Sequence, residues 1–240
     1  MARNTYLTLS DLKSIPVPAQ TDSYTPVAQA DLWDTVCETF QGGGYTLSNE
    51  QHMVHRKRPV FVSKIDVEAS WLSDLGGTVK WTIATMNSYD KSKSARIIFG
   101  GTVGICTNGL IIADHILKTK HTTHVWDRLP DLIFNAYDQF ADECSRYISR
   151  QNQLKRETTT VKDLAHFTMT IANKGILPKS QVVDFYEEVV KPSYDYQTPD
   201  LCLWNMQAAY THLAKEWNPM ERPQRVLAFD RALNHAYAIT

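Results

Sequence analysis

A change of hydrophobic period divides the chain and limits the folds that it can adopt. Between about residues 45 and 106, apolar and β-branched residues form short alternating runs, separated by Arg58-Pro59 and Gly76-Gly77. From Val125 onward, apolar residues recur every three or four positions instead. The first pattern is typical of strands and the second of amphipathic helices. Strands followed by helices, without alternation, predict an α+β fold.

The same patterns place the individual elements. A helix is expected from Val27 to Phe40 and should end at Gly42-Gly43-Gly44. An antiparallel β-meander should follow, with strands at about 45–47, 53–55, 60–67, 79–86 and 95–106, the last bulged at Gly100-Gly101. In the fourth strand, Lys80, Thr82 and Ala84 are expected on the solvent-exposed face of the sheet. A long helix from Val125 to about Gln153 and helices at 161–173, 180–190, 199–217 and 223–236 complete the chain, with Ser180 capping the third of these five.

Three regions are expected from this order. Residues 1–28 contain Pro16, Pro18 and Pro26 with few apolar clusters, which is typical of an extended N-terminal arm. Residues 29–156 should form the α+β core. Residues 157–240 should form a helical C-terminal region packed on that core.

Composition excludes several classes of protein. The hydrophobic share of 43% is ordinary for a globular chain, and no apolar run approaches the roughly 20 residues that cross a bilayer. The first residues lack a continuous apolar stretch, so no secretory signal, no membrane and a cytoplasmic setting are expected. The cysteines at 37, 106, 144 and 202 form no C-x-x-C pair, which favours free thiols over disulfides or zinc.

Charge is unevenly distributed along the chain. The net charge is −1, which argues against a protein whose entire surface binds polyanions. Residues 1–54 contain two Lys/Arg and six Asp/Glu, and residues 129–240 contain twelve and fourteen. Residues 55–128 contain eleven and six, so basic character is concentrated in the β portion. A solvated sheet face with scattered lysines is the simpler explanation, and the sequence leaves both open.

Three polar segments carry this basic character, at 55–58 (HRKR), 87–94 (NSYDKSKS) and 118–124 (KTKHTTH). Each has an ordinary structural explanation: protection of a sheet edge, a polar hairpin tip, and a helix N-cap at Thr122 or Thr123. Together they could also contact phosphate oxygens. The candidate nucleic-acid-binding residues are Arg56, Lys57, Arg58, Asn87, Ser88, Lys91, Lys93, Arg96, Lys118, Lys120 and His121.

The sequence gives less support for a catalytic or cofactor-binding site than for the basic segments. His121 and His124 could join Cys106, Asp114 or His115 around a metal, but H-x-x-H without a third ligand at a recognisable spacing is weak. Gly42-Gly43-Gly44 is followed by no G-K-S/T, which excludes a Walker loop. We therefore expect no metal, no cofactor and no catalytic residue.

Several short motifs together carry a family resemblance. They are Y-T-P-V (24–27), N-S-Y-D-K-S (87–92), C-T-N-G (106–109), K-H-T (120–122) and L-W-N-M-Q-A-A-Y-T (203–211). The chain resembles phage- and plasmid-encoded proteins of a domain-of-unknown-function family that share N-S-x-D-K-S, V-C-x-N-G and K-H-T segments. Thr107 stands where members commonly have Asp. The resemblance implies a mobile-element protein, located in the host cytoplasm if phage-encoded. The order of helix, meander and helix is also similar to that of phage single-strand annealing recombinases, an analogy of fold only.

Three functions remain open from the sequence. The first is a non-enzymatic protein that binds or anneals single-stranded DNA, or another polyanion, without sequence specificity and as a homo-oligomer. The second is a phage interaction protein that binds a host defence protein or a signalling nucleotide through the same basic loops. The third and weakest is a hydrolase or nuclease using Asp90, Asp114 and His121, which lacks the paired carboxylates or three ligands of metal-assisted phosphoryl chemistry.

Overall fold

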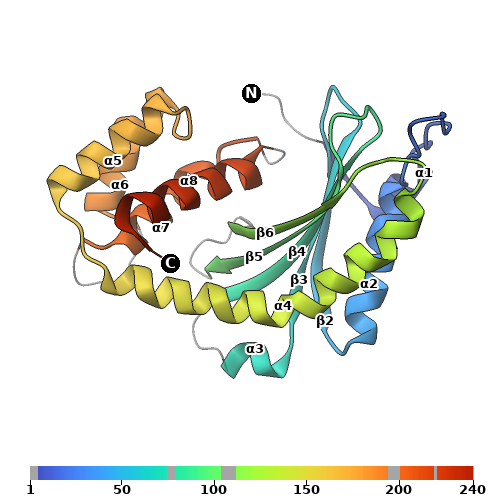
Figure 1. Cartoon of the computed structure of the whole chain (residues 1–240), viewed down its shortest axis with the longest axis horizontal. Coiled ribbons are helices and arrows are strands. Elements are labelled where there is room, and N and C mark those ends of the chain that lie inside the picture. The colour runs from blue at the N-terminus through green and yellow to red at the C-terminus, as the bar shows by residue number, and fades with distance from the viewer. Residues whose placement is uncertain (1–4, 75–78, 104–111, 194–200, 219–220, 240) are drawn as a thin grey trace. The chain divides into compact units, whose positions relative to one another are not determined.

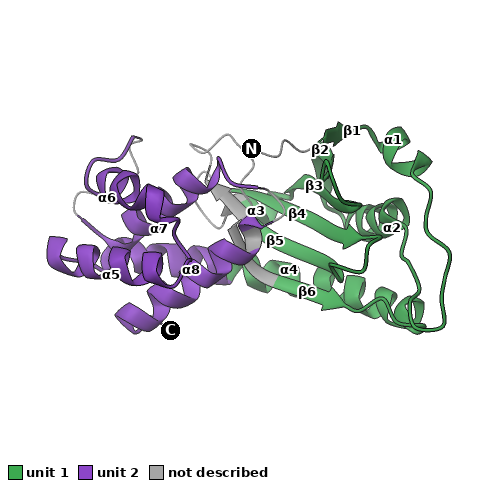
Figure 2. Ribbon diagram, turned by 90° about the horizontal axis from the view of Figure 1, so that it is seen from above, with its two compact units in different colours: residues 1–104, 113–145 green, residues 105–112, 146–240 purple. Residues whose placement is uncertain are grey.

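The computed structural model describes residues 5–74, 79–103, 112–193, 201–218 and 221–239. They form two compact units, which Figure 2 colours separately. Unit 1 comprises Met1–Gly104 and Ala113–Ser145, and unit 2 comprises Ile105–Ile112 and Arg146–Thr240. The two units divide between Ser145 and Arg146, inside one long helix, whereas the sequence pattern placed the boundary at the end of that helix, residue 156.

Unit 1 is built on a six-stranded sheet whose spatial order follows the sequence order, β1 to β6. The pairs that join β1 through β5 are all antiparallel, which confirms the predicted α+β class and β-meander. The strands are β1 (Thr5–Leu7), β2 (Thr46–Val54), β3 (Val60–Glu68), β4 (Val79–Ser88), β5 (Ala95–Val103) and β6 (Ile112–Thr119).

Strand details differ from the sequence expectation in β2 and in β5. The two expected strands at 45–55 are one strand, β2, interrupted by an irregular register between Ser48 and Gln51, where Asn49 takes a left-handed φ of 57°. Gly100 and Gly101 pair in continuous register with Thr82 and Trp81, so the expected bulge is absent from β5. A glycine opposite Trp81 leaves room for a large cross-strand ring.

The sixth strand and a short helix were not expected. The apolar residues of β6 are interrupted by Asp114 and His115, so they do not alternate, and pairing at the sheet edge determines the conformation instead. Helix α3 (Ser70–Asp74) follows β3. The expected solvent-exposed face of β4 is also wrong in part, since Thr82 and Ala84 are buried and only Lys80 is exposed.

The first 28 residues are not an extended arm. β1 pairs with β2, and helix α1 (Leu9–Ser14) follows it, capped by reciprocal hydrogen bonds between Thr8 and Asp11. Leu12 is 2% exposed and clusters with Ala30 and Phe61. The prolines that suggested an arm lie after this capped turn, so they do not prevent it from forming.

Two helices cover one face of the sheet. Helix α2 (Gln29–Gly42) lies against β3 and β4, because Gln29 Nε2 donates to Ser63 Oγ (3.0 Å) and Thr85 Oγ1 (2.8 Å). Helix α4 (Val125–Arg156) reaches the same face through the ring contact of Phe140 with Phe99, at 5.7 Å between centroids. The face is the same because Phe99 pairs with Ile83, two residues from Thr85. Figure 1 shows both helices along the sheet.

Unit 2 is helical. Its elements after the end of α4 are α5 (Val161–Asn173), the 3-10 turn Lys179–Gln181, α6 (Val182–Val190), α7 (Leu203–Ala214) and α8 (Arg222–Tyr237). Ser180 lies in the 3-10 turn and does not cap α6, contrary to expectation. The stacked rings of Tyr210 and Phe229, at 3.9 Å, join α7 to α8 in the core.

A partly buried arginine, Arg150, connects three helices of unit 2. Arg150 Nη2 of α4 lies 3.3 Å from Asp230 Oδ1 and donates to Asn234 Oδ1 (3.0 Å), while Nη1 donates to Gln207 Oε1 (3.3 Å). Burial is the largest influence on Asp230 and raises the pKa of its carboxyl, because the charge and hydrogen bond of Arg150 offset only part of that effect.

No helix in the described ranges is long and apolar enough to cross a membrane. Cys37, Cys144 and Cys202 are free thiols, as expected, and Cys106 lies outside the described residues. Burial raises the pKa of the Cys37 thiol to about 12, so this half-buried thiol stays protonated at neutral pH.

Two adjacent glycines at the end of α2 provide a test of this packing. A Cβ at Gly43 would overlap the ring of Tyr137 on α4, whereas a Cβ at Gly42 would meet nothing within 4 Å. We expect Gly43→Ala to lower the free energy of unfolding by about 1–3 kcal/mol, because the ring must move. Gly42→Ala, the matched control, should be neutral or stabilising by up to about 1 kcal/mol. Urea denaturation of both variants checks this, and equal stabilities would contradict the α2–α4 contact.

Candidate nucleic-acid interface

Three connections of unit 1 meet at one end of the sheet, which we call the loop end: the β2–β3 loop (55–59), the β4–β5 loop (89–94) and the β6–α4 segment (120–124). Alternate connections of an antiparallel meander must share an end. The pairing of Val60 with Ser88 and the hydrogen bond from Tyr89 N to Pro59 O (2.8 Å) bring the first two loops together. Figure 1 shows these connections at the same end.

The β4–β5 loop is closed by two buried polar side chains. Asn87 Nδ2 donates to Val27 O (2.6 Å), and its Oδ1 accepts from Ser88 N (2.7 Å). Ser88 Oγ donates to Lys93 O (3.1 Å) and accepts from Lys93 N (2.9 Å). Both side chains are fully buried, which contradicts their prediction as phosphate contacts. They shape the loop instead, since their hydrogen-bonding groups are occupied within the chain.

An ion pair connects this loop to its neighbour. Arg58 Nε donates to Asp90 Oδ2 at 2.8 Å, and Asp90 Oδ1 accepts from Ser92 N at 3.0 Å. Partial burial alone would raise the pKa of Asp90, but the hydrogen bonds from Ser92, Arg58 and Ser88 together lower it to about 2. The carboxylate is therefore charged at neutral pH and compensates Arg58.

Tyr24 connects the β4–β5 loop to the β6–α4 segment. Its hydroxyl donates to Ser88 O (3.1 Å), and Lys91 Nζ lies 4.9 Å from its ring centroid. The rings of Tyr24 and His121 are 5.3 Å apart, and Thr25 N donates to His121 O (3.3 Å). The sequence indicated Tyr24 only as part of the Y-T-P-V motif and gave it no role.

His121 differs from its prediction as a surface contact. It is 8% exposed, and burial lowers its pKa although the backbone groups of Thr25 and Lys93 act in the opposite direction. The ring is therefore neutral at pH 7 and contributes packing rather than charge. Thr122 is not a helix cap either, because its buried Oγ1 has no hydrogen-bond partner.

The remaining predicted cations are available to solvent. Arg56, Lys57, Lys91, Lys118 and Lys120 are exposed, and Lys93 and Arg96 are half-buried. Arg96 Nε donates to Ser94 Oγ (3.1 Å), and burial lowers its pKa. Within the described part of the chain, none of these seven side chains forms an ion pair, unlike Arg58. The structure thus places basic residues of three segments, up to 64 positions apart in the sequence, at one end of the sheet.

A second cluster of polar side chains in unit 1 is connected in the same sequence, serine to histidine to carboxylate, as the catalytic triad of a hydrolase. Ser63 Oγ lies 2.8 Å from His52 Nδ1, and His52 Nε2 lies 3.1 Å from Glu50 Oε1, which also accepts from the Trp33 indole. Burial lowers the pKa of His52, against the opposing effect of Glu50. Ser63 is fully buried beneath α2, so no substrate can reach it and these groups serve the packing of the helix.

Among the described residues, no three His, Cys, Asp or Glu side chains are grouped so that they could hold a metal ion. His124 Nδ1 lies 3.2 Å from Asp127 at the exposed start of α4. Cys106 and the side chains of Asp114 and His115 lie outside what the structure describes.

The backbone of Lys91 provides a test of the loop geometry. Its φ of 64° is left-handed, which costs a residue with a side chain about 1–2 kcal/mol, more than the roughly 0.5–1 kcal/mol of an exposed cation–π contact. We expect Lys91→Gly to raise the free energy of unfolding by about 0.5–1 kcal/mol. Lys93→Gly, where φ is not left-handed, should lower it. Urea denaturation distinguishes the two, and a destabilised Lys91→Gly would contradict this conformation.

The lowered pKa of Asp90 predicts an acid-sensitive loop. A carboxyl whose folded-state pKa lies below its ordinary value of 3.8 contributes stability that is present above about pH 4 and lost as the pH falls through about 2. We expect Asp90→Asn to remove this part of the pH dependence, while Asp131→Asn, at an exposed position of α4, should keep it. Unfolding by urea between pH 2 and pH 7 measures it. If the free energy of unfolding of Asp90→Asn falls at low pH as steeply as that of the unaltered protein, the hydrogen bonds do not stabilise the carboxylate.

Comparison with known proteins identifies a family. The model of a family described as Domain of unknown function (DUF932) matches residues 18–212. No curated protein and no solved structure matches the chain. The matched range contains every candidate residue of the loop end and ends within α7, at residue 212. The chain belongs to the family of proteins that share this domain of unknown function, DUF932.

Proposed function

We propose that this protein binds single-stranded nucleic acid, most specifically single-stranded DNA of a mobile element such as a phage, without sequence specificity. The observation that carries the proposal is the convergence of three basic segments at the loop end, with Asp90 already paired to Arg58. The affinity would come from phosphate contacts and release of counterions. The binding residues would be Arg56, Lys57, Arg58, Lys91, Lys93, Arg96, Lys118 and Lys120.

The kinds of side chain at the loop end favour contacts to the backbone of the nucleic acid. Lysines dominate the exposed set, and lysine acts as a point charge toward phosphate. The amide and hydroxyl that could have read a base edge, Asn87 and Ser88, are buried. Binding through phosphates alone carries no sequence information, which supports a protein that coats or anneals strands.

One exposed aromatic residue favours a single strand over a duplex. Trp126 lies in the first turn of α4, directly after the β6–α4 segment, and is 46% exposed. Unpaired bases stack on such rings at about 1–3 kcal/mol each, whereas bases in a duplex are not available. We infer that Trp126 stacks on a base of a strand whose phosphates lie along the loop end.

Annealing and self-association belong to the same proposal. A protein that brings complementary strands together must screen their mutual repulsion, and several copies on one strand would do so. Phe134, 64% exposed on α4, is a large apolar side chain available to a second copy. Light scattering with and without a long oligonucleotide measures the size of the complex.

Charge variants test the binding surface. We expect the double variant Lys91→Gln/Lys120→Gln to bind a fluorescent 30-nucleotide deoxythymidine strand more weakly, and the slope of log K against log salt to fall by about 1.4, because two phosphate contacts are lost. Lys179→Gln/Lys191→Gln, exposed lysines of unit 2, serve as the matched control. Asp90→Asn should bind more tightly, because it frees Arg58 and removes a negative charge. Fluorescence anisotropy at rising salt measures all three.

Two results would contradict the proposal. One is the absence of binding at about 50 mM salt, where phosphate contacts are strong. The other is equal weakening by the unit 1 and unit 2 variants. If the strand fails to bind but a mononucleotide saturates a site that Lys91→Gln/Lys120→Gln abolishes, a small signalling nucleotide is the ligand of the loop end instead. Trp126→Ala separates strand from duplex, since it should weaken binding to the single strand only.

A further inference from the structure

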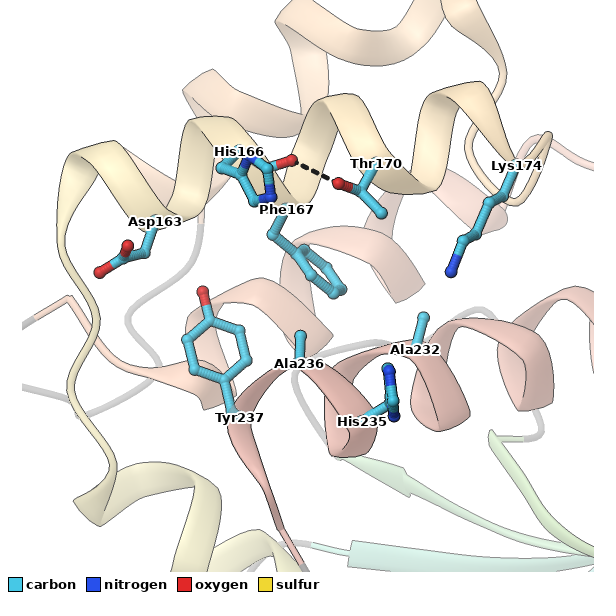
Figure 3. A pocket seen from close by; sticks show the side chains of 9 residues that line it. All are labelled: Asp163, His166, Phe167, Thr170, Lys174, Ala232, His235, Ala236 and Tyr237. Carbon is cyan, nitrogen blue, oxygen red and sulfur yellow. Dashed lines mark hydrogen bonds between the residues drawn. The ribbon is translucent and has the colours of Figure 1, made fainter.

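Unit 2 contains a pocket between α5 and α8 with a volume of about 640 Å³. Sites for small molecules in proteins have volumes of about 300–1,000 Å³. Figure 3 shows the side chains that line it, from both helices. They are Asp163, His166, Phe167, Thr170 and Lys174 on the α5 side and Ala232, His235, Ala236 and Tyr237 on the α8 side.

The pocket exists because α8 presents two alanines to α5, while α5 is held in place by the packing of Phe167. Phe167 is 3% exposed and contacts the rings of Phe229 (5.7 Å) and Tyr237 (5.9 Å), which fixes α5 on α8. Beside these rings, Ala232 and Ala236 lie one turn apart on α8 and are too short to fill the space. The apolar floor is therefore present before any ligand binds.

The two ends of the pocket carry opposite charge. Figure 3 shows Lys174 and His235 pointing into the same end from the two helices, with Asp163 at the other end. Thr160 Oγ1 donates to Asp163 Oδ2 at 2.7 Å, so that carboxylate is held in the first turn of α5. No ion pair in the described residues involves Lys174, His166 or His235.

The hydroxyls in the pocket are already engaged. Thr170 Oγ1 donates to His166 O (2.9 Å), and the Tyr237 hydroxyl pairs with Thr159 Oγ1 (3.0 Å). The donors left for a ligand are therefore the ammonium group of Lys174 and the imidazoles. A floor of one buried ring, Phe167, and two short alanines, with Lys174 and His235 at one end, is complementary to a molecule with an apolar body and an anionic head.

We propose that this pocket binds a small organic anion. Its flat apolar body lies over Phe167, Ala232 and Ala236, and its carboxylate or phosphate group faces Lys174 and His235. The site lies in unit 2, whereas the loop end lies in unit 1, so the inference does not depend on nucleic-acid binding.

Matched probes test the charge of the ligand. Benzoate, phenyl phosphate and benzylammonium have the same ring, with negative, negative and positive heads. We expect the two anions to bind the full chain saturably, with dissociation constants on the order of 1 mM for ligands of this size, and benzylammonium to bind at least about tenfold more weakly. Ligand-observed NMR titration measures all three. Tighter binding of one anion identifies the preferred head group.

Matched variants test the location. Ala236→Leu fills the pocket without changing charge and should weaken benzoate and phenyl phosphate by at least about tenfold. Ala165→Leu, the same change at an exposed α5 position outside the pocket, should leave both affinities unchanged. Lys174→Gln, at an exposed position, should weaken both anions severalfold and keeps the test valid if Ala236→Leu does not fold.

Several results would overturn the proposal. They are the absence of saturable binding of either anion up to about 10 mM, preference for benzylammonium, or anion affinity that survives both Ala236→Leu and Lys174→Gln. Each of these would leave strand binding by the loop end unaffected, because the charge variants of that surface are measured separately.

Discussion

Antiparallel pairing in sequence order is the constraint on which the candidate interface depends. Each strand from β2 to β5 pairs with its neighbour in the chain, so connections β2–β3, β4–β5 and β6–α4 share one end of the sheet. Val60 opposite Ser88 fixes this relation at the level of single residues. A slip of one residue would turn Ser63 and Thr85 away from α2 and remove the hydrogen bonds of Gln29.

At the loop end, different residues determine the shape of the loops and supply the positive charge. Asn87, Ser88 and Tyr24 are buried and hydrogen-bonded, and they define the path of the β4–β5 loop. The exposed lysines are carried on that frame and have no acidic partners of their own among the described residues. Among the described cations of the loop end, Arg58 alone is compensated, by Asp90. Within one polar motif, some side chains can thus be required for the structure, while others a few residues away remain available for binding.

Unit 2 uses polar groups in a different way. Arg150 is surrounded by Asp230, Asn234 and Gln207, so a charge is satisfied inside the helical core. Between α5 and α8, by contrast, Lys174 and His235 face a space that Ala232 and Ala236 leave open. The first arrangement fixes how the helices pack, because removing one partner would leave a charge inside the protein without compensation. The second leaves donors for a molecule from outside.

The sequence alone determined the α+β class, the meander, the long helix and the concentration of basic residues in the β portion, because these follow from local periodicity and composition. It did not determine that residues 5–7 join the sheet, that β6 is a strand, or that Asn87, Ser88 and His121 are buried. Those outcomes depend on contacts between residues distant in the chain, such as Asn87 with Val27 and Tyr24 with His121. Only the tertiary structure decides whether a polar side chain finds its partner inside the protein or remains available at the surface, since both fates are compatible with the same local sequence.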